Sequence, residues 1–364
     1  MSVANNEFAA IPADARIVLC YPVASRHVDQ IAAAAPWASI IDAGQERIAA
    51  ELPTADIFCG HAKVPVPWAE TVAAGRLRWI QSSAAGLDHC LVAEVVASPI
   101  TVTSASGVLA DQVAEHALGL AIACTRRLPL FLEQQRRQEF VRRPTRDLTG
   151  ATVGILGFGG VGRRLAEVLA PFRVRILATD YFPVAKPAHV AFLGPPESLP
   201  QLLGEVDILF LAAPLTPQTR GIIDREALAR MRPGSMLVNV ARGPLVDAEA
   251  LAAALESGHL DSAALDVTPE EPPAAESPLW RAPRLLITPH VAGQSADRID
   301  AMTDFFCDNL GRLATGRPLR NLVDKTLGFP EPVIDHGEQT SREPEPTGHP
   351  GEWPAIAGRR TVAR

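Results

Sequence analysis

The chain has 364 residues, of which 47% are hydrophobic, and it carries a formal net charge of -7 at pH 7. This length and apolar content suffice for two domains with separate cores. The acidic balance removes any general electrostatic attraction to nucleic acids or anionic membranes, so we expect neither as a partner.

The five cysteines are scattered and include no C-x-x-C pair, so the sequence predicts neither a disulfide framework nor a metal site. No apolar run is long enough to span a bilayer, and the N-terminus lacks a basic region followed by an apolar stretch. We therefore expect a soluble cytoplasmic protein.

Short apolar segments in the first third of the chain predict a parallel-sheet unit. The expected strands are residues 17–21, 56–59, 77–81 and 100–103. Alanine-rich stretches between them, such as residues 28–35, are typical of helices. Residues 108–127 predict a long helix, and the charged stretch 133–146 predicts a solvated crossing or an arm.

A second unit alternates strands and helices more regularly. The expected strands lie near residues 152–156, 174–179, 206–211, 236–240, 262–266 and 285–287. Six such strands fit a doubly wound dinucleotide-binding fold. Residues 295–315 predict a helix that packs back on the first unit, and from residue 329 the composition predicts a disordered tail.

A glycine-rich turn, VGILGFGGVG, follows the first strand of the second unit. Gly157 suits the tight turn, Gly159 would let the backbone approach a pyrophosphate, and Gly162 would let helix and strand pack closely. Gly160 and Val161 then open a helix whose N-terminal amides would face the phosphates.

An acidic residue, Asp180, ends the next apolar run. A carboxylate about 20 residues after the glycine turn can accept hydrogen bonds from both ribose hydroxyls of NAD and would repel a 2′-phosphate. The sequence therefore predicts an NAD site with a preference for NADH over NADPH.

Three chemically active residues follow the ends of later strands. Arg242 could bind a substrate carboxylate through two hydrogen bonds, although a surface arginine capping a loop is the alternative. Glu271 alone is typical of a solvated loop residue, and His290 alone of a structural histidine. Together they form a consistent set of anion clamp, histidine partner and acid/base group.

Seven motifs resemble the D-isomer-specific 2-hydroxyacid dehydrogenase family across residues 50–320. They are WIQSSAAGLDHC, ASGVLADQVAEHALGL, VGILGFGGVG, APLTPQTRGII, NVARGPLVDAEAL, ALDVTPEEP and TPHVAGQS. The resemblance implies two Rossmann-like or flavodoxin-like α/β parallel-sheet domains with a cleft between them. The implied substrate domain is 1–104 plus 294–328, and the implied NAD-binding domain is 105–293, followed by the tail 329–364.

The resemblance also implies roles for individual residues. Arg242 would bind the substrate's carboxylate and carbonyl, His290 would donate the proton to the carbonyl oxygen, and Glu271 would orient the imidazole and favour its charged form. Backbone amides near Ala85, Gly86 and Leu87 would hold the carboxylate. The remaining cofactor contacts would come from Pro214, Val240, Ala241 and Asp266, the last beside the nicotinamide.

The implied function is NAD-dependent interconversion of a small 2-oxo acid and its D-2-hydroxy acid by a homodimer. The substrate could be of the hydroxypyruvate, glyoxylate or 3-phosphoglycerate type. Glu271 argues against formate dehydrogenase, which has glutamine at the corresponding position. Lys63 is either a substrate contact or a solvated lysine, and the role of His61 is open.

Two alternatives remain. An NAD(H)-sensing corepressor would retain the same fold and the same three polar residues, and phosphite oxidation on the same scaffold is a minor option.

Overall fold

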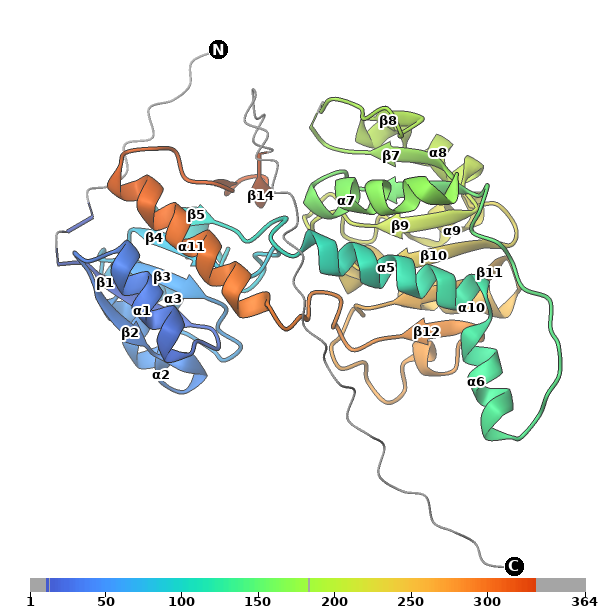
Figure 1. Ribbon diagram of the computed structural model, residues 1–364, viewed down its shortest axis with the longest axis horizontal. Helices are drawn as coiled ribbons and strands as arrows, with labels where there is room; N and C mark the ends of the chain where they lie inside the picture. The colour runs from blue at the N-terminus through green and yellow to red at the C-terminus, as the bar shows by residue number, and fades with distance from the viewer. Residues whose placement is uncertain (1–10, 13, 183, 332–364) are drawn as a thin grey trace, which may run out of the picture. The chain divides into compact units, whose positions relative to one another are not determined.

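The computed structural model describes residues 11–12, 14–182 and 184–331 (Figure 1). Two parallel β-sheets flanked by helices organise these residues, which confirms the predicted α/β class. The boundaries proposed for the two domains, and the cleft between them, stay predictions. No helix within the described ranges has the length and apolar content needed to cross a membrane.

The first sheet has five parallel strands in the order β2-β1-β3-β4-β5. Their bounds are β1 Arg16–Cys20, β2 Ser39–Asp42, β3 Ile57–Gly60, β4 Trp79–Ser82 and β5 Thr101–Thr103. Sequence periodicity predicts four of them and misses β2. This strand lies at the sheet edge with all its residues partly or fully exposed, so it lacks the buried apolar run that marks the others.

Helices cover both faces of the first sheet. They are α1 Ser25–Ala34, α2 Gly44–Glu51, α3 Trp68–Ala73, α4 Ala93–Val96 and α11 Arg298–Ala314. Alternate strand residues point to opposite faces, so Ile17 packs in the cluster of α1 and α11 while Val18 packs in that of α2 and α3. Trp79 of β4 lies with its ring centroid 5.5 Å from that of Phe306 in α11.

The second sheet has seven parallel strands in the order β12-β11-β10-β9-β6-β7-β8. Their bounds are β6 Thr152–Leu156, β7 Arg175–Thr179, β8 Phe192–Gly194, β9 Ile208–Leu211, β10 Ser235–Asn239, β11 Leu260–Leu265 and β12 Leu285–Ile287. The six expected strands are present, and β8 is an additional short edge strand. The strand order reverses at β6, where open α/β sheets place their ligands.

Two helical layers enclose this sheet. One contains α5 Ala110–Thr125 and α7 Gly160–Leu169, and the other contains α8 Leu199–Glu205, α9 Arg225–Arg230 and α10 Ala248–Glu256. Within β10, Met236 and Val238 face the first layer and Leu237 faces the second. Both faces are therefore apolar, as expected of a buried parallel sheet.

Single-turn 3-10 helices connect several of these elements. They are η1 Leu52–Thr54, η2 Ala170–Phe172, η3 Pro196–Ser198, η4 Gly243–Leu245 and η5 Pro278–Trp280.

Helix α6, Leu128–Arg136, differs from the expected charged crossing. The charged stretch begins inside this helix, and the solvated loop starts only after it. Leu128, Leu130 and Leu132 are 40–56% exposed, and Phe140 is fully exposed. Figure 1 shows α6 and the loop after it projecting beyond the end of α5.

The chain ends, within the described residues, in a small antiparallel hairpin of β13 Val323–Asp324 and β14 Phe329–Pro330. The sequence places the start of a disordered tail at residue 329, whereas Phe329 and Pro330 form β14. Residues 332–364, the rest of the predicted tail, lie outside the described residues.

Candidate functional site

The glycine turn joins β6 to α7 as expected. Gly157 has φ +93°, and a Cβ there would lie 2.6 Å from the backbone nitrogen of Ala213, so a larger residue is excluded sterically. A Cβ on Gly162 would collide with the carbonyl oxygen of Gly157. A Cβ on Gly159 would meet no atom within 4 Å, so the backbone at this position is open to a ligand.

The carboxylate of Asp180 is tied to this turn. Its Oδ2 accepts a hydrogen bond of 2.5 Å from the amide of Phe158, and its Oδ1 accepts one of 3.0 Å from the amide of Phe182. The half-buried carboxylate is thus held at the carboxyl end of β7, next to the first turn of α7.

Glu271 and His290 form a hydrogen-bonded pair at the carboxyl ends of neighbouring strands. Glu271 follows β11 and His290 follows β12, and Oε2 of Glu271 lies 2.7 Å from Nδ1 of His290. Oε1 of Glu271 also accepts a 3.3 Å hydrogen bond from the amide of Thr268. The imidazole is 48% exposed, and its Nε2 has no hydrogen-bond partner in the part of the chain that the structure describes.

A short hydrogen-bond network around Asp266 positions the loop that carries His290. Asp266 is 1% exposed, and its carboxylate accepts hydrogen bonds from the amides of Val291 and Ala292 and from the hydroxyl of Thr288. His116 of α5 lies 3.0 Å from the same hydroxyl. The sequence expectation for Asp266 was a nicotinamide contact, and it did not anticipate this supporting network.

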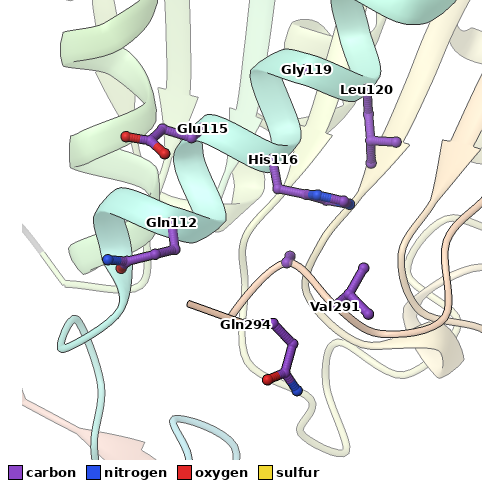
Figure 2. A pocket seen from close by; sticks show the side chains of 8 residues that line it. Gln112, Glu115, His116, Gly119, Leu120, Val291 and Gln294 are labelled. Carbon is purple, nitrogen blue, oxygen red and sulfur yellow. The ribbon is translucent and has the colours of Figure 1, made fainter. Parts of the chain in front are cut away.

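A hollow of about 430 Å³ lies between α5 and this loop. Figure 2 shows Gln112 and His116 on the helix side, with Val291 and Gln294 opposite them.

Arg242 follows β10, the next strand of the sheet, and reaches the loop after β4. Its Nη1 donates to the carbonyl of Ala241 at 2.8 Å, and its Nε lies 3.3 Å from Oδ1 of Asp88. Burial alone would raise the pKa of Asp88, but the charge and hydrogen bond of Arg242, together with a backbone hydrogen bond and the nearby His89, lower it. A Cβ on Gly86 would occupy the space of the guanidinium, so a side chain there would displace Arg242 from this position.

The peptide nitrogens of Ala85, Gly86 and Leu87 have no acceptor among the described residues. Three unpaired amides beside a guanidinium form an arrangement suited to a carboxylate. The geometry therefore brings the sequence-predicted anion-binding loop and Arg242 into contact.

The other predicted cofactor residues lie along the same edge of the sheet. Pro214 follows β9 and is exposed, while Val240 and Ala241 follow β10 and are 9% and 8% exposed. Gly160 and Val161 form the first turn of α7. Their contacts with a cofactor stay predictions.

One pair of side chains was not anticipated. His61 and His89 stack with ring centroids 3.9 Å apart and an angle of 20° between their planes. Burial lowers both pKa values, and that of His89 falls to about 3. The sequence could not reveal this pair because the two residues are 28 positions apart and become neighbours only through β3 and β4. Lys63 is exposed.

Comparison with known proteins identifies the family to which the chain belongs. The model of the D-isomer specific 2-hydroxyacid dehydrogenase, NAD binding domain, matches residues 118–292. A glyoxylate reductase from Thermofilum pendens is 34% identical over 70% of this chain and 77% of its own length. The chain belongs to the D-isomer-specific 2-hydroxyacid dehydrogenase family.

Other members of this family are also similar to this chain in sequence or structure. A D-3-phosphoglycerate dehydrogenase from Mycobacterium tuberculosis is 35% identical over 70% of this chain, but the match spans only 48% of that protein. A crystal structure of a D-isomer specific 2-hydroxyacid dehydrogenase from Xanthobacter autotrophicus Py2, in complex with NADPH and MES, has a TM-score of 0.73 and 28% identity. The superposition covers 87% of this chain and 100% of the Xanthobacter chain. Family membership confirms the resemblance read from the motifs and identifies the seven-stranded sheet as an NAD-binding domain.

Proposed function

We propose that the protein is an NAD(H)-dependent dehydrogenase that interconverts a small 2-oxo acid and its D-2-hydroxy acid. The observation that carries this proposal is the Glu271–His290 pair, in which Nδ1 is engaged at 2.7 Å while Nε2 has no partner among the described residues. An imidazole held in this way is suited to proton transfer to or from a substrate oxygen. Arg242, on the adjacent strand, supplies a fixed positive charge.

The residues at the glycine turn fit a dinucleotide. The open backbone at Gly159 and the N-terminus of α7 can receive a pyrophosphate, and Asp180 can accept ribose hydroxyls. The carboxylate would repel a 2′-phosphate, which supports a preference for NADH. Since the related Xanthobacter structure contains NADPH, this preference must be measured directly.

We propose the following roles for these groups in the reaction. A bound nicotinamide would supply the hydride in reduction or accept it in oxidation. The Ala85–Leu87 amides and Arg242 bind the carboxylate, and Arg242 also stabilises negative charge that develops on the carbonyl oxygen. Nε2 of His290 gives that oxygen its proton in reduction and removes it in oxidation, while Glu271 orients the ring and stabilises its charged form.

We further propose a homodimer formed through the cofactor domain. The exposed leucines of α6 and the fully exposed Phe140 would form an apolar arm that a second copy could cover.

The five cysteines are free, and four of them are buried, which supports the expectation of a reducing cytoplasm.

A panel of 2-oxo acids tests the proposed activity. Glyoxylate, hydroxypyruvate, pyruvate and 3-phosphohydroxypyruvate would be supplied with NADH and, separately, with NADPH, and cofactor oxidation followed by absorbance. We expect turnover of at least one small 2-oxo acid with NADH. Tight NADH binding without turnover of any acid would instead support an NAD(H) sensor, and turnover of phosphite with NAD would indicate the phosphite reaction.

A further inference from the structure

The C-terminal hairpin makes an aromatic contact with the loop that follows Asp180. The ring centroid of Phe329 in β14 lies 5.7 Å from that of Tyr181 and 5.8 Å from that of Phe182, both edge-on. Tyr181 and Phe182 also contact each other edge-on at 5.2 Å. Three aromatic rings from segments about 150 residues apart therefore form one cluster, which we call the aromatic clasp.

One side of the clasp is anchored to the first sheet. Leu322 forms an antiparallel bridge with Thr103 of β5, and the side chain of Asn321 donates to the carbonyls of Ser104 and Ser106 at 3.1 and 2.7 Å. Val323 is buried in the core of that sheet.

The hairpin turn has an anchor of its own on α4. The ammonium of Lys325 donates to the carbonyls of Val95 and Ser98. The hairpin is thus fixed both at its base and at its turn, and these two anchors hold Phe329 at a defined position.

The other side of the clasp is joined to the carboxylate predicted to select the ribose. The amide of Phe182 donates to Oδ1 of Asp180, whose Oδ2 accepts from Phe158 in the glycine turn. The position of Phe182 therefore influences where the carboxylate lies. Neither anchor of the hairpin belongs to the second sheet, so the clasp connects the ribose-binding loop to a different part of the chain.

We propose that Phe329 is a positioning residue for the cofactor, which holds the Tyr181–Phe182 loop in the conformation that binds the adenosine ribose. The proposal rests on the NAD-dependent function proposed above. Phe329 does not contact the reacting atoms, so its loss should weaken NADH binding and leave the chemical step unchanged. Truncation immediately before Phe329 should weaken NADH binding in the same way. If the tail from residue 329 were dispensable, this truncation would leave NADH binding unchanged.

Phe329→Ala tests the proposal in the full-length protein. Each edge-on aromatic contact stabilises the binding conformation of the loop only modestly. Losing two of them should therefore raise the NADH dissociation constant by about threefold to tenfold. Binding would be measured by NADH fluorescence, and kcat at saturating NADH should change less than about twofold. Phe329→Tyr, which retains the ring, should bind NADH as the wild type does.

Three controls separate the possible outcomes. Phe192→Ala removes another partly exposed phenylalanine, from β8, and should not alter NADH binding. A chain ending at Gly328 should match Phe329→Ala, whereas one ending at Pro332 should match the wild type. A lower melting temperature without a change in NADH affinity would overturn the proposal and leave the clasp as packing. Failure of the wild type to bind NADH would instead refute the proposed function.

Discussion

Nδ1 of His290 lies 2.7 Å from Oε2 of Glu271, although the residues are 19 positions apart and follow different strands. Because β11 and β12 are parallel neighbours, their carboxyl ends meet at one edge and bring the two side chains together. The second carboxylate oxygen is held by the amide of Thr268. The carboxylate therefore orients the imidazole, and Nε2 has no hydrogen-bond partner within residues 11–12, 14–182 and 184–331.

Removal of the imidazole should abolish most of the turnover. We expect His290→Ala to lower kcat by about 100-fold or more, because general acid/base catalysis typically contributes that much. NADH affinity should stay within about twofold of the wild type. Glu271→Gln keeps an acceptor but removes the charge, so a smaller loss of kcat is expected. His189→Ala, at an exposed loop histidine, is the control, and near-normal turnover in His290→Ala would refute the mechanism.

A single methyl group at residue 86 should displace Arg242. The Cβ of Gly86→Ala would take the space of the guanidinium, so we expect the Michaelis constant for the 2-oxo acid to rise by about tenfold or more with NADH affinity unchanged. Steady-state kinetics and NADH fluorescence measure the two effects. Gly204→Ala, where the added Cβ meets no atom within 4 Å, should behave as the wild type. Unchanged kinetics in Gly86→Ala would show that substrate binding does not depend on this position of the guanidinium.

Loss of charge at Asp180 should relax cofactor discrimination. Asp180→Asn keeps one carbonyl oxygen as an acceptor but no longer repels a 2′-phosphate. We expect the ratio of kcat/KM for NADH to that for NADPH to fall by about tenfold, which corresponds to roughly 1.4 kcal/mol. If the wild type already uses both cofactors equally, the assignment of this carboxylate is wrong.

A charge on α6 should weaken the proposed dimer. Leu132 is 56% exposed, and Leu132→Glu would place a carboxylate in the apolar arm. Sedimentation at micromolar concentration should show a dimer for the wild type and a larger monomer fraction for the variant. Val96→Glu, at another exposed apolar side chain, should leave the dimer intact. A monomeric wild type would contradict the prediction.

The stacked histidines should make folding stability depend on pH. The pKa of His89 is lowered from 6.5 to about 3 by burial, with His61 adding to the shift. The unfolded chain therefore binds a proton below pH 6.5 that the folded chain does not. The contribution of the neutral His89 to the free energy of unfolding is fully present above pH 6.5. It is lost as the pH falls from 6.5 towards 3, by at most about 1.4 kcal/mol per pH unit.

Urea unfolding at pH 7.5, 6.5 and 5.5 measures this effect. His89→Gln cannot take up the proton, so its stability should fall less between pH 6.5 and 5.5 than that of the wild type. Equal slopes for the two proteins would show that His89 is not held neutral by the fold.

Much of the fold could be predicted from local sequence pattern. Ten of the twelve strands in the two parallel sheets fall within short apolar segments between turns, and period and composition identify such segments. The exceptions are the edge strands β2 and β8, whose partly exposed residues carry no continuous apolar run. The glycine turn was also predictable. A side chain at Gly157 or Gly162 would clash with backbone atoms, so these positions need glycine, and the spacing of the glycines is visible in the sequence.

The contacts between distant segments could not be obtained in this way. Motif order indicates that Arg242, Glu271 and His290 act together, but only strand order and parallel register determine that Glu271 meets Nδ1 at hydrogen-bond distance. The stacking of His61 on His89 and the contact of Phe329 with Tyr181 likewise need the folded chain. Local patterns depend on each segment's own burial and backbone geometry, whereas these pairs depend on which segments the sheets bring side by side.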